Sequence, residues 1–287
     1  FLPCRPAGFF GLKFFVLFMI LLEQMETETR IKNLLGLTLN DPNHKDEINF
    51  LMGEFKITKE QLLASWLYWD TSIRKYSNEV YSSKALRLVM HLHNYLKDSW
   101  HEKRQECVLG YLNKIMPKSI CEIGFGTPQK YVKKYLEKDV KIILGDYEQS
   151  SLQFAEKLIS RWSSYWKQKV DLTIFDLNKD NLPTDYTVYI FQDSIEHADN
   201  PSKALKKYVE GVLSGTHFIF SLPIEVGNPI PEHHIFWKDK DEVLSWLAEC
   251  GLEVIDNTVI KMNKEVDLYS LSLHPDFSEL VVLARKN

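Results

Sequence analysis

The spacing of hydrophobic residues changes near residue 117, and this change divides the chain into two regions. Between residues 25 and 117 apolar residues recur every three or four positions, the spacing that buries one face of a helix. The clearest helical segments are residues 57–69, 82–96 and 105–116. This region has few β-branched runs and no glycine-rich linker, so we expect a helical cap packed on the rest of the chain.

After residue 117 short apolar runs alternate with amphipathic segments. The runs that predict strands are residues 118–125, 140–146, 170–177, 184–194, 216–224, 252–262 and 278–286. Helical spacing lies between them in residues 128–138, 150–166, 200–213 and 239–251. Strand–helix alternation with short connections predicts right-handed crossovers and a mostly parallel, doubly wound sheet. The last two strands have no helix between them, so we expect an antiparallel hairpin near one edge of the sheet.

These patterns predict three parts: an apolar leader over residues 1–24, the helical cap over residues 25–117, and an α/β domain over residues 118–287. The apolar run over residues 9–22 is interrupted by Lys13 and is shorter than the roughly 20 residues that span a bilayer. Three interpretations stay open for it: a leader outside the working protein, a membrane-associating or packing helix, and a signal peptide. Membrane contact is expected, if anywhere, only through this run.

Composition narrows the class of protein. The chain has 287 residues, 45% of them hydrophobic, which suffices for one large buried core. The formal net charge of −4 does not indicate a broad nucleic-acid-binding surface. The four cysteines have no Cys-x-x-Cys spacing, which favours free thiols in a reducing compartment. We therefore expect a cytoplasmic location.

A glycine-containing turn comes after the first predicted strand, in "ICEIGFGTPQK". Gly124 and Gly126 permit a positive φ and leave space for a ligand to approach the backbone, and Glu122 precedes them, where we expect its carboxylate to face the mouth of a pocket. The dinucleotide motif G-x-G-x-x-G is incomplete, because Gln129 occupies the third glycine position. A tight turn with no ligand remains the alternative for this stretch alone.

Acidic residues close the next two predicted strands. Asp146 ends the second strand, where it can accept hydrogen bonds from a ribose diol. Asp176 ends the third, where it can accept a hydrogen bond from the exocyclic amine of adenine while Phe175 or Leu177 packs on the ring. Each aspartate alone is also an ordinary turn residue. Carboxylates at three successive strand ends favour a shared ligand site.

The segments "EIGFGT", "GDYEQSSLQFAEK", "FDLNKDNLP" and "FQDSIEHADNP" together resemble the successive motifs of class I S-adenosylmethionine-dependent methyltransferases, and of small-molecule O-methyltransferases in particular. The resemblance covers roughly residues 118–286. It implies a Rossmann-like, seven-stranded sheet with one antiparallel strand, with S-adenosylmethionine as the cofactor. The residues that it assigns to cofactor binding are Glu122, Gly124, Gly126, Asp146, Tyr147, Asp176, Leu177, Gln192 and Asp193.

Within that set the resemblance implies separate roles. Gln192 and Asp193 lie beside the sulfonium, Asp146 holds the ribose and Asp176 holds the adenine. Many relatives have a third glycine where this chain has Pro128, which fits the first position of a helix but removes one backbone donor near the cofactor.

Histidines are the candidates for catalysis, because methylation of a hydroxyl needs a group to receive its proton. His197 comes after the fourth predicted strand, and His233 and His234 come after the fifth. The alternative for His197 is that it orders its loop, and for the other two that they pack or face solvent. His91 and His93 are assigned no role.

Two further interpretations stay open. Asp193, Glu196, His197 and either His233 or His234 are similar to the metal-binding set of RNA 3′-end 2′-O-methyltransferases. Since plain small-molecule methyltransferases show similar residues without a metal, we expect no metal here. A catalytically silent binding protein is the other alternative, and a dehydrogenase fits least. The sequence thus predicts methyl transfer to a small molecule, more at oxygen than at nitrogen or carbon, with nucleic acid not expected as a partner.

Overall fold

The structure is a computed structural model, and it describes residues 25–26, 28–72, 83–96, 100–226, 232–261 and 277–287. Residues 28–40 are helical. The later helices are α2 (Lys45–Phe55), α3 (Lys59–Ser72), α5 (Lys84–His93), α6 (Trp100–Ile115), α7 (Lys130–Leu136), α8 (Gln149–Trp162), α9 (Pro201–Gly211) and α10 (Lys240–Glu249), with short 3₁₀ turns η1 (Trp166–Gln168) and η2 (Ile195–His197). The strands are β1 (Ser119–Ile123), β2 (Lys141–Asp146), β3 (Val170–Ile174), β4 (Val188–Gln192), β5 (His217–Ile224), β6 (Leu252–Lys261) and β7 (Ser278–Lys286).

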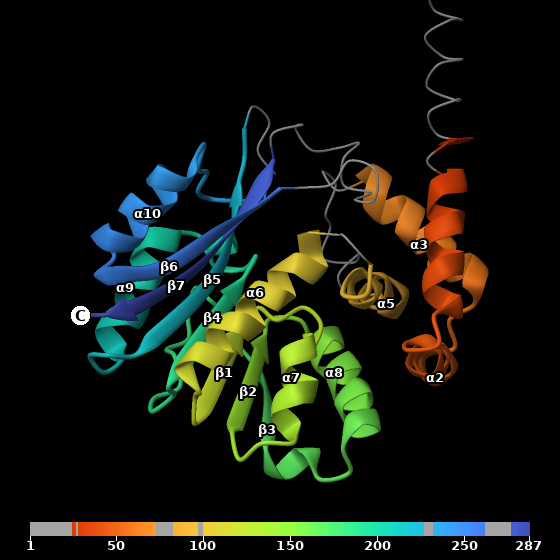
Figure 1. Cartoon of the computed structure of the whole chain (residues 1–287), viewed down its shortest axis with the longest axis horizontal. Helices are drawn as coiled ribbons and strands as arrows, with labels where there is room; N and C mark the ends of the chain where they lie inside the picture. Colours follow the sequence, from red (N-terminus) through yellow and green to blue (C-terminus); the bar gives the residue numbers. More distant parts are fainter. Residues whose placement is uncertain (1–24, 27, 73–82, 97–99, 227–231, 262–276) are drawn as a thin grey trace, which may run out of the picture.

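The strands form a seven-stranded sheet in the order β3-β2-β1-β4-β5-β7-β6 (Figure 1). β1 to β5 pair in parallel, and β7 runs antiparallel between β5 and β6. The predicted α/β fold, with its mostly parallel sheet and one antiparallel strand, is confirmed. The chain order reverses between β1 and β4, so the carboxyl ends of these two strands flank the place where ligands bind in open α/β sheets.

Helices cover both faces of the sheet. Figure 1 shows α9 and α10 on one side and α6, α7 and α8 on the other. Alternate residues of the central strands face the two hydrophobic cores, one on each side of the sheet. Tyr189 and Phe191 of β4 belong to the core under α9 and α10, whereas Val188 and Ile190 belong to the core on the opposite face. Strands buried on both faces are the usual consequence of parallel pairing, which explains why they read as continuous apolar runs.

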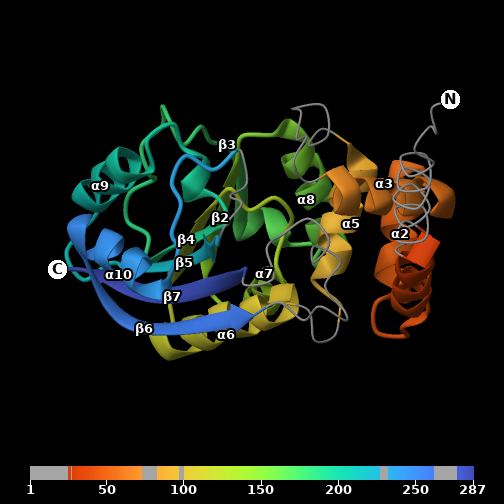
Figure 2. The same ribbon diagram turned by 90° about the horizontal axis from the view of Figure 1, so that it is seen from above.

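α2 and α5 pack beyond the sheet, against α8, and α3 packs on α5. Figures 1 and 2 both place α2, α3 and α5 at the end of the molecule that carries α8. α6 differs, because it packs on the sheet itself, against β5, β6 and β7. The last helix of the predicted cap is therefore part of the layer that covers the sheet. The division into 1–24, 25–117 and 118–287 stays a prediction, and its first part lies outside the described residues.

Local signals set several helix ends. Thr58 and Gln61 form a reciprocal capping box: the Thr58 N–H donates to Gln61 Oε1 at 2.9 Å and the Gln61 N–H to Thr58 Oγ1 at 3.2 Å. Gly251 comes after α10 with a φ of 89°, as expected of a glycine after a helix. The expectation for Pro128 was wrong: α7 has its N-cap at Gln129, so the proline precedes the cap.

Among the described residues, no helix combines the length and the apolar character that crossing a bilayer requires.

Candidate functional site

The glycine turn after β1 is shaped by close contact with the loop after β4. Gly124 has a φ of 73°, and a Cβ built there would lie 2.4 Å from the Cβ of Ser194. Ser194 is fixed in turn, since its hydroxyl donates to the Ile123 carbonyl at 2.9 Å. A side chain at Gly124 would therefore push apart the two strand ends that flank the ligand-binding position.

Asp146 joins the ends of β1 and β2. Its Oδ2 accepts the Gly126 N–H at 2.9 Å, and its Oδ1 accepts the Glu148 N–H at 2.9 Å. A carboxylate offers about four acceptor positions, so two remain for a ligand. Gly126 has a φ of 58°, and a Cβ there would lie 3.1 Å from Met90 of α5. The turn is thus held by an acidic side chain and covered by an N-terminal helix.

Glu122 lies in β1, just before the turn, and is buried. Its side chain is fully buried, and it accepts hydrogen bonds from the Tyr131 hydroxyl at 2.6 Å and from the Gln192 side-chain amide. Burial raises the pKa of Glu122 to about 7, against the two hydrogen bonds, which lower it. The expected pocket-facing carboxylate is therefore a buried group that orients Gln192.

The other amide atom of Gln192, Oε1, is left without a hydrogen-bond partner among the described residues. Because Nε2 donates to Glu122, Oε1 is turned away from it. The Oε1 atom is also buried. A buried acceptor with no partner is costly, and it indicates a ligand or water at this position.

The residues after β2 and β3 lie near one another but differ in exposure. The Phe175 N–H donates to the Asp146 carbonyl at 3.0 Å, which ties the two loops together. Asp176 accepts the Asn178 N–H and the Lys179 ammonium, and its hydrogen bond with Lys179 lowers its pKa. Tyr147 is 63% exposed, and Leu177 packs partly against the core of the α9 side. The Asp176 carboxylate therefore accepts hydrogen bonds within its own turn, from Asn178 and Lys179.

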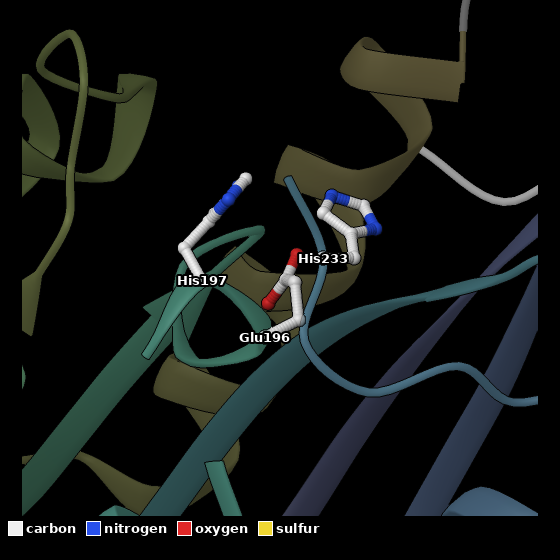
Figure 3. A group of neighbouring side chains, drawn as sticks. All are labelled: Glu196, His197 and His233. Carbon is white, nitrogen blue, oxygen red and sulfur yellow. The ribbon is translucent and has the colours of Figure 1, made fainter. Parts of the chain in front are cut away.

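Glu196, His197 and His233 form a cluster at the carboxyl end of β4. Each offers one ligand atom, and these atoms lie within 4.8 Å of one another. Figure 3 shows the Glu196 carboxylate beside the two imidazole rings, with Glu196 and His197 on η2 and His233 on the segment after β5. We call these three residues the Glu–His cluster. The sequence predicted His197, His233 and His234 as candidates, and the fold brings the first two together.

Both imidazoles of the cluster are oriented by a bond at Nδ1. His233 Nδ1 lies 3.0 Å from Glu225 Oε2, and His197 Nδ1 lies 3.2 Å from the Glu232 carbonyl oxygen. Nε2 of each ring is left for another partner. His234 lies outside the cluster, exposed and against the Asp199 carbonyl, but its backbone N–H donates to the Glu196 carbonyl at 2.8 Å. The loop after β5 is thereby fastened to η2.

The cluster carries shifted pKa values with clear causes. Burial raises the pKa of Glu196 against the attraction of His233. Burial, and then the neighbouring His233, lower the pKa of His197 to about 4. Burial would also lower the pKa of His233, but the bond to Glu225 and the nearby carboxylates raise it. The pKa values of these two neighbouring histidines are therefore shifted in opposite directions.

Two arginines from the N-terminal region reach the site, and no pattern in the sequence indicated either of them. Arg104 of α6 is buried and contacts Asp193, which comes after β4, and Glu279 of β7 at 3.3 Å. Arg87 of α5 is 2% exposed, with its Nη1 3.5 Å from the Gly126 carbonyl oxygen. Only the tertiary fold reveals them, because they are 89 and 39 residues from these partners.

A cavity of about 560 Å³ lies between α8 and the edge strand β3. Its lining includes Gln153, Trp166 and Thr173 but neither the glycine turn nor the Glu–His cluster. It reaches the carboxyl end of β3 at Ile174 but is not lined by the residues that follow β1 or β4.

The comparisons with known proteins agree with the fold. The chain is similar to the [4+2]-cyclase SpnF (TM-score 0.54, 14% identity, 66% of this chain and 82% of that one). It is similar to YjhP from E. coli (TM-score 0.53, 9% identity, 65% and 93%) and to a StiE O-MT segment (TM-score 0.51, 10% identity, 77% and 81%). No protein-family model matches the sequence, and no curated protein matches it.

The sheet order and these similarities define the class: the chain has the fold of class I S-adenosylmethionine-dependent methyltransferases. The similarity to a cyclase shows that this fold is also used for other chemistry, so the function must be argued from the site.

Proposed function

We propose that the protein is an S-adenosylmethionine-dependent methyltransferase that acts on a hydroxyl of a small molecule. The observation that carries the proposal is the bond from the Gly126 N–H to Asp146, which joins the turn after β1 to the end of β2. β1 is one of the two strands between which the chain order reverses. A ligand can approach the glycine turn closely, because the glycines have no side chain. The bond ties this turn to a carboxylate that still has free acceptor positions.

The described residues fit the cofactor. Gln192 Oε1 supplies a buried acceptor without a partner beside the turn, and Asp146 supplies the carboxylate for a ribose. Gly124 and Gly126 hold the turn open for the methionine part, with Arg87 against it. Asp176, Leu177 and Tyr147 form the rim proposed for adenine. Glu122 contributes by orienting Gln192.

S-adenosylmethionine supplies an activated methyl group on a sulfonium. In the proposed transfer the S–CH₃ bond breaks with its electron pair returning to sulfur, and an O–CH₃ bond forms from a lone pair of the acceptor. The acceptor's proton passes to an imidazole of the Glu–His cluster. The chain's own task is to align the two atoms and to receive that proton.

An oxygen acceptor and a small substrate are supported by two observations. His197 and His233 lie together just past Gln192 and Asp193, where a proton acceptor is needed for a hydroxyl but not for an amine that is already neutral. The formal charge of −4 gives no general attraction for RNA. Cys107, Cys121 and Cys250 are free thiols, which suits the cytoplasm as the proposed location.

Calorimetric titration tests the cofactor first. We expect S-adenosylmethionine and S-adenosylhomocysteine to bind and NAD not to bind. Asp146→Ala should abolish or strongly weaken binding, while Asp139→Ala, which changes an exposed aspartate, should leave it unchanged. No binding of either sulfur compound by the folded protein would reject the proposal and favour a silent scaffold.

Transfer of a labelled methyl group tests the acceptor. Incubation with a small-metabolite extract and, separately, with total RNA should label the metabolite pool. Label in RNA alone would contradict the small-molecule assignment.

A further inference from the structure

Buried polar side chains gather between the sheet and the first half of α6. Residues two positions apart on a strand share a face of the sheet. Gln192 of β4, Ser221 of β5 and Glu279 of β7 each lie two positions from a residue of the core on the α6 side, so all three point toward α6. Each is 5% exposed or less, and Arg104 of α6 reaches Glu279 at 3.3 Å. We call Gln192, Ser221, Glu279 and Arg104 the α6 layer.

The α6 layer contains polar atoms that the described residues do not satisfy. Ser221 Oγ, Glu279 Oε2 and Arg104 Nε are buried and have no hydrogen-bond partner among those residues, as is also true of Gln192 Oε1. Gln192 and Ser221 are register partners in the parallel pairing of β4 and β5, so they lie about 5 Å apart. A buried polar atom without a partner is costly. Four of them in neighbouring positions indicate that a polar ligand binds here.

The charges in the α6 layer balance without a charged ligand. Arg104 forms ion pairs with Asp193 and with Glu279. Burial, and then the charge of Asp193, raise the pKa of Glu279, so its carboxyl favours the neutral form and can donate a hydrogen bond. The guanidinium of Arg104 and the carboxylate of Asp193 then offset each other. A neutral ligand therefore suits this place better than a cation or an anion.

The unpaired atoms need a ligand that both donates and accepts hydrogen bonds. The Nε–H of Arg104 can only donate, Oε1 of Gln192 can only accept, and the hydroxyl of Ser221 can do both. A hydroxyl group of a ligand also does both, whereas an ether or a ketone oxygen only accepts. Because the unpaired atoms come from several elements, one ligand hydroxyl cannot reach them all. Adjacent hydroxyl groups on one molecule can.

Asp193 connects the α6 layer to the Glu–His cluster. It acts electrostatically on Glu279 of the layer and on His233 of the cluster. Its side chain is 32% exposed, so the layer reaches the surface at this residue. A ligand that enters beside Asp193 can contact the layer on one side and an imidazole of the cluster on the other.

We infer that the methyl acceptor is a polyol with adjacent hydroxyl groups, such as a sugar or a cyclitol, held by Ser221, Glu279 and Arg104. This inference rests on the proposed function and specifies its substrate. One hydroxyl gives its proton to an imidazole of the Glu–His cluster and receives the methyl group, while its neighbours bond to the α6 layer. A simple phenol or an amino alcohol would leave buried polar atoms unpaired, and sites built to bond hydroxyls reject such compounds strongly.

Methyl transfer from labelled S-adenosylmethionine to a panel of acceptors tests the inference with the unmodified chain. The panel contains glucose, galactose, mannose and myo-inositol, the methyl glycosides of the three sugars, and phenol and ethanolamine for comparison. We expect label in one or more of the polyols and at least about tenfold less in phenol and ethanolamine. The glycosides distinguish a glycosyl unit from a free sugar as the acceptor. Label confined to phenol or ethanolamine would overturn the inference.

Two variants test the residues of the layer. Ser221→Ala should raise the KM for the labelled polyol about 3- to 10-fold through the loss of one hydrogen bond, with little change in kcat. Ser160→Ala, which changes an exposed serine of α8, is its matched control and should leave the KM unchanged. Glu279→Gln should also raise the KM. Its control is Glu253→Gln, which removes a surface ion pair with Arg285 and should have no effect.

Titration with S-adenosylhomocysteine separates this inference from the proposed function. Both layer variants should keep the affinity of the unmodified chain for this compound, and melting temperatures show that they are folded. If the compound binds but no polyol is labelled, or if both layer variants leave the KM unchanged, the inference is wrong and the proposed methyltransferase stands. If the compound does not bind to the unmodified chain, the proposed function fails and the inference fails with it.

Discussion

Arg104 of α6 and Asp193 after β4 form a partly buried ion pair that connects the N-terminal helices to the strand end at the site. Asp193 has a φ of 45°, an uncommon conformation for a residue other than glycine, so its loop depends on such contacts. Glu279 of β7 shares the same guanidinium at 3.3 Å. One cation thereby fixes a helix, a loop and the antiparallel strand relative to one another.

Arg104→Met tests this connection. The substitution keeps an apolar stem but leaves Asp193 and Glu279 without their cation, so we expect the free energy of unfolding to fall by about 3–5 kcal/mol. Arg285→Met is the control, since Arg285 pairs with Glu253 at 2.7 Å on the surface, where about 0–1 kcal/mol is expected. Urea unfolding measures both. Equal losses in the two variants would contradict a special role for Arg104.

Gly124→Ala tests the close contact at the turn. The new Cβ would meet the Cβ of Ser194 at 2.4 Å in addition to the strain of a positive φ. Gly215→Ala carries a similar φ of 84° but meets nothing within 4 Å, so it measures the backbone strain alone. We expect Gly215→Ala to cost about 1 kcal/mol and Gly124→Ala about 1–3 kcal/mol more.

Calorimetric melting and S-adenosylhomocysteine titration report the result for both glycines. Combining Gly124→Ala with Ser194→Gly should recover part of the lost melting temperature, because the second change removes the atom that the alanine meets. If the melting temperature does not recover at all, the contact between the new Cβ and Ser194 is not the cause of the destabilisation.

Glu47 of α2 predicts a loss of stability in acid. It accepts hydrogen bonds from His91 at 2.9 Å, Tyr95 at 2.5 Å and Trp162 of α8 at 2.5 Å. Burial alone raises the pKa of Glu47, but these partners, His91 foremost, lower it from 4.5 to about 2. Because the folded-state pKa lies below the unfolded one, the stabilisation is present above pH 4.5 and disappears as the pH falls toward about 2.

The size of this acid effect follows from the difference between the unfolded-state and folded-state pKa values of Glu47. A difference between 4.5 and about 2 corresponds to roughly 3 kcal/mol in the free energy of unfolding. The free energy of unfolding, measured in urea between neutral and acid pH, should fall less steeply over that window for Glu47→Gln than for the unmodified protein. Glu54→Gln, which removes a surface pair with Lys157, should keep the original steepness. Parallel curves for Glu47→Gln and the unmodified protein would contradict the prediction.

Gln192→Leu tests the proposed sulfonium position. Gln192 Oε1 is a buried carbonyl dipole, which favours the positive sulfur of S-adenosylmethionine over the neutral sulfur of S-adenosylhomocysteine. We expect the substitution to weaken the binding of S-adenosylmethionine about 3- to 10-fold more than the binding of S-adenosylhomocysteine. This difference corresponds to about 1 kcal/mol of binding free energy. Titration of both compounds measures the ratio. An equal loss for the two would mean that Oε1 does not face the sulfur.

The sequence predicted structure correctly where the interactions that determine it are between residues close together in the chain. The capping box of Thr58 and Gln61, the glycine after α10 and the alternation of strands and helices depend on residues a few positions apart. The motif order also located the two histidines that the fold brings together, because both come after strands whose carboxyl ends lie on one edge of the sheet. The start of α7 was misplaced because Pro128 suits either side of a helix N-terminus.

The sequence by itself determined the class of fold, the strand ends at which the candidate site lies, and Gly124, Gly126, Asp146, His197 and His233 as candidate residues. Only the tertiary structure decided which side chains are buried together. It buried Glu122, brought Arg104 to Asp193 across 89 residues and set Glu196 beside two oriented imidazoles. The physical reason is that periodicity and turns depend on neighbours in the chain, whereas the pairing of buried polar groups depends on which elements the packing brings into contact.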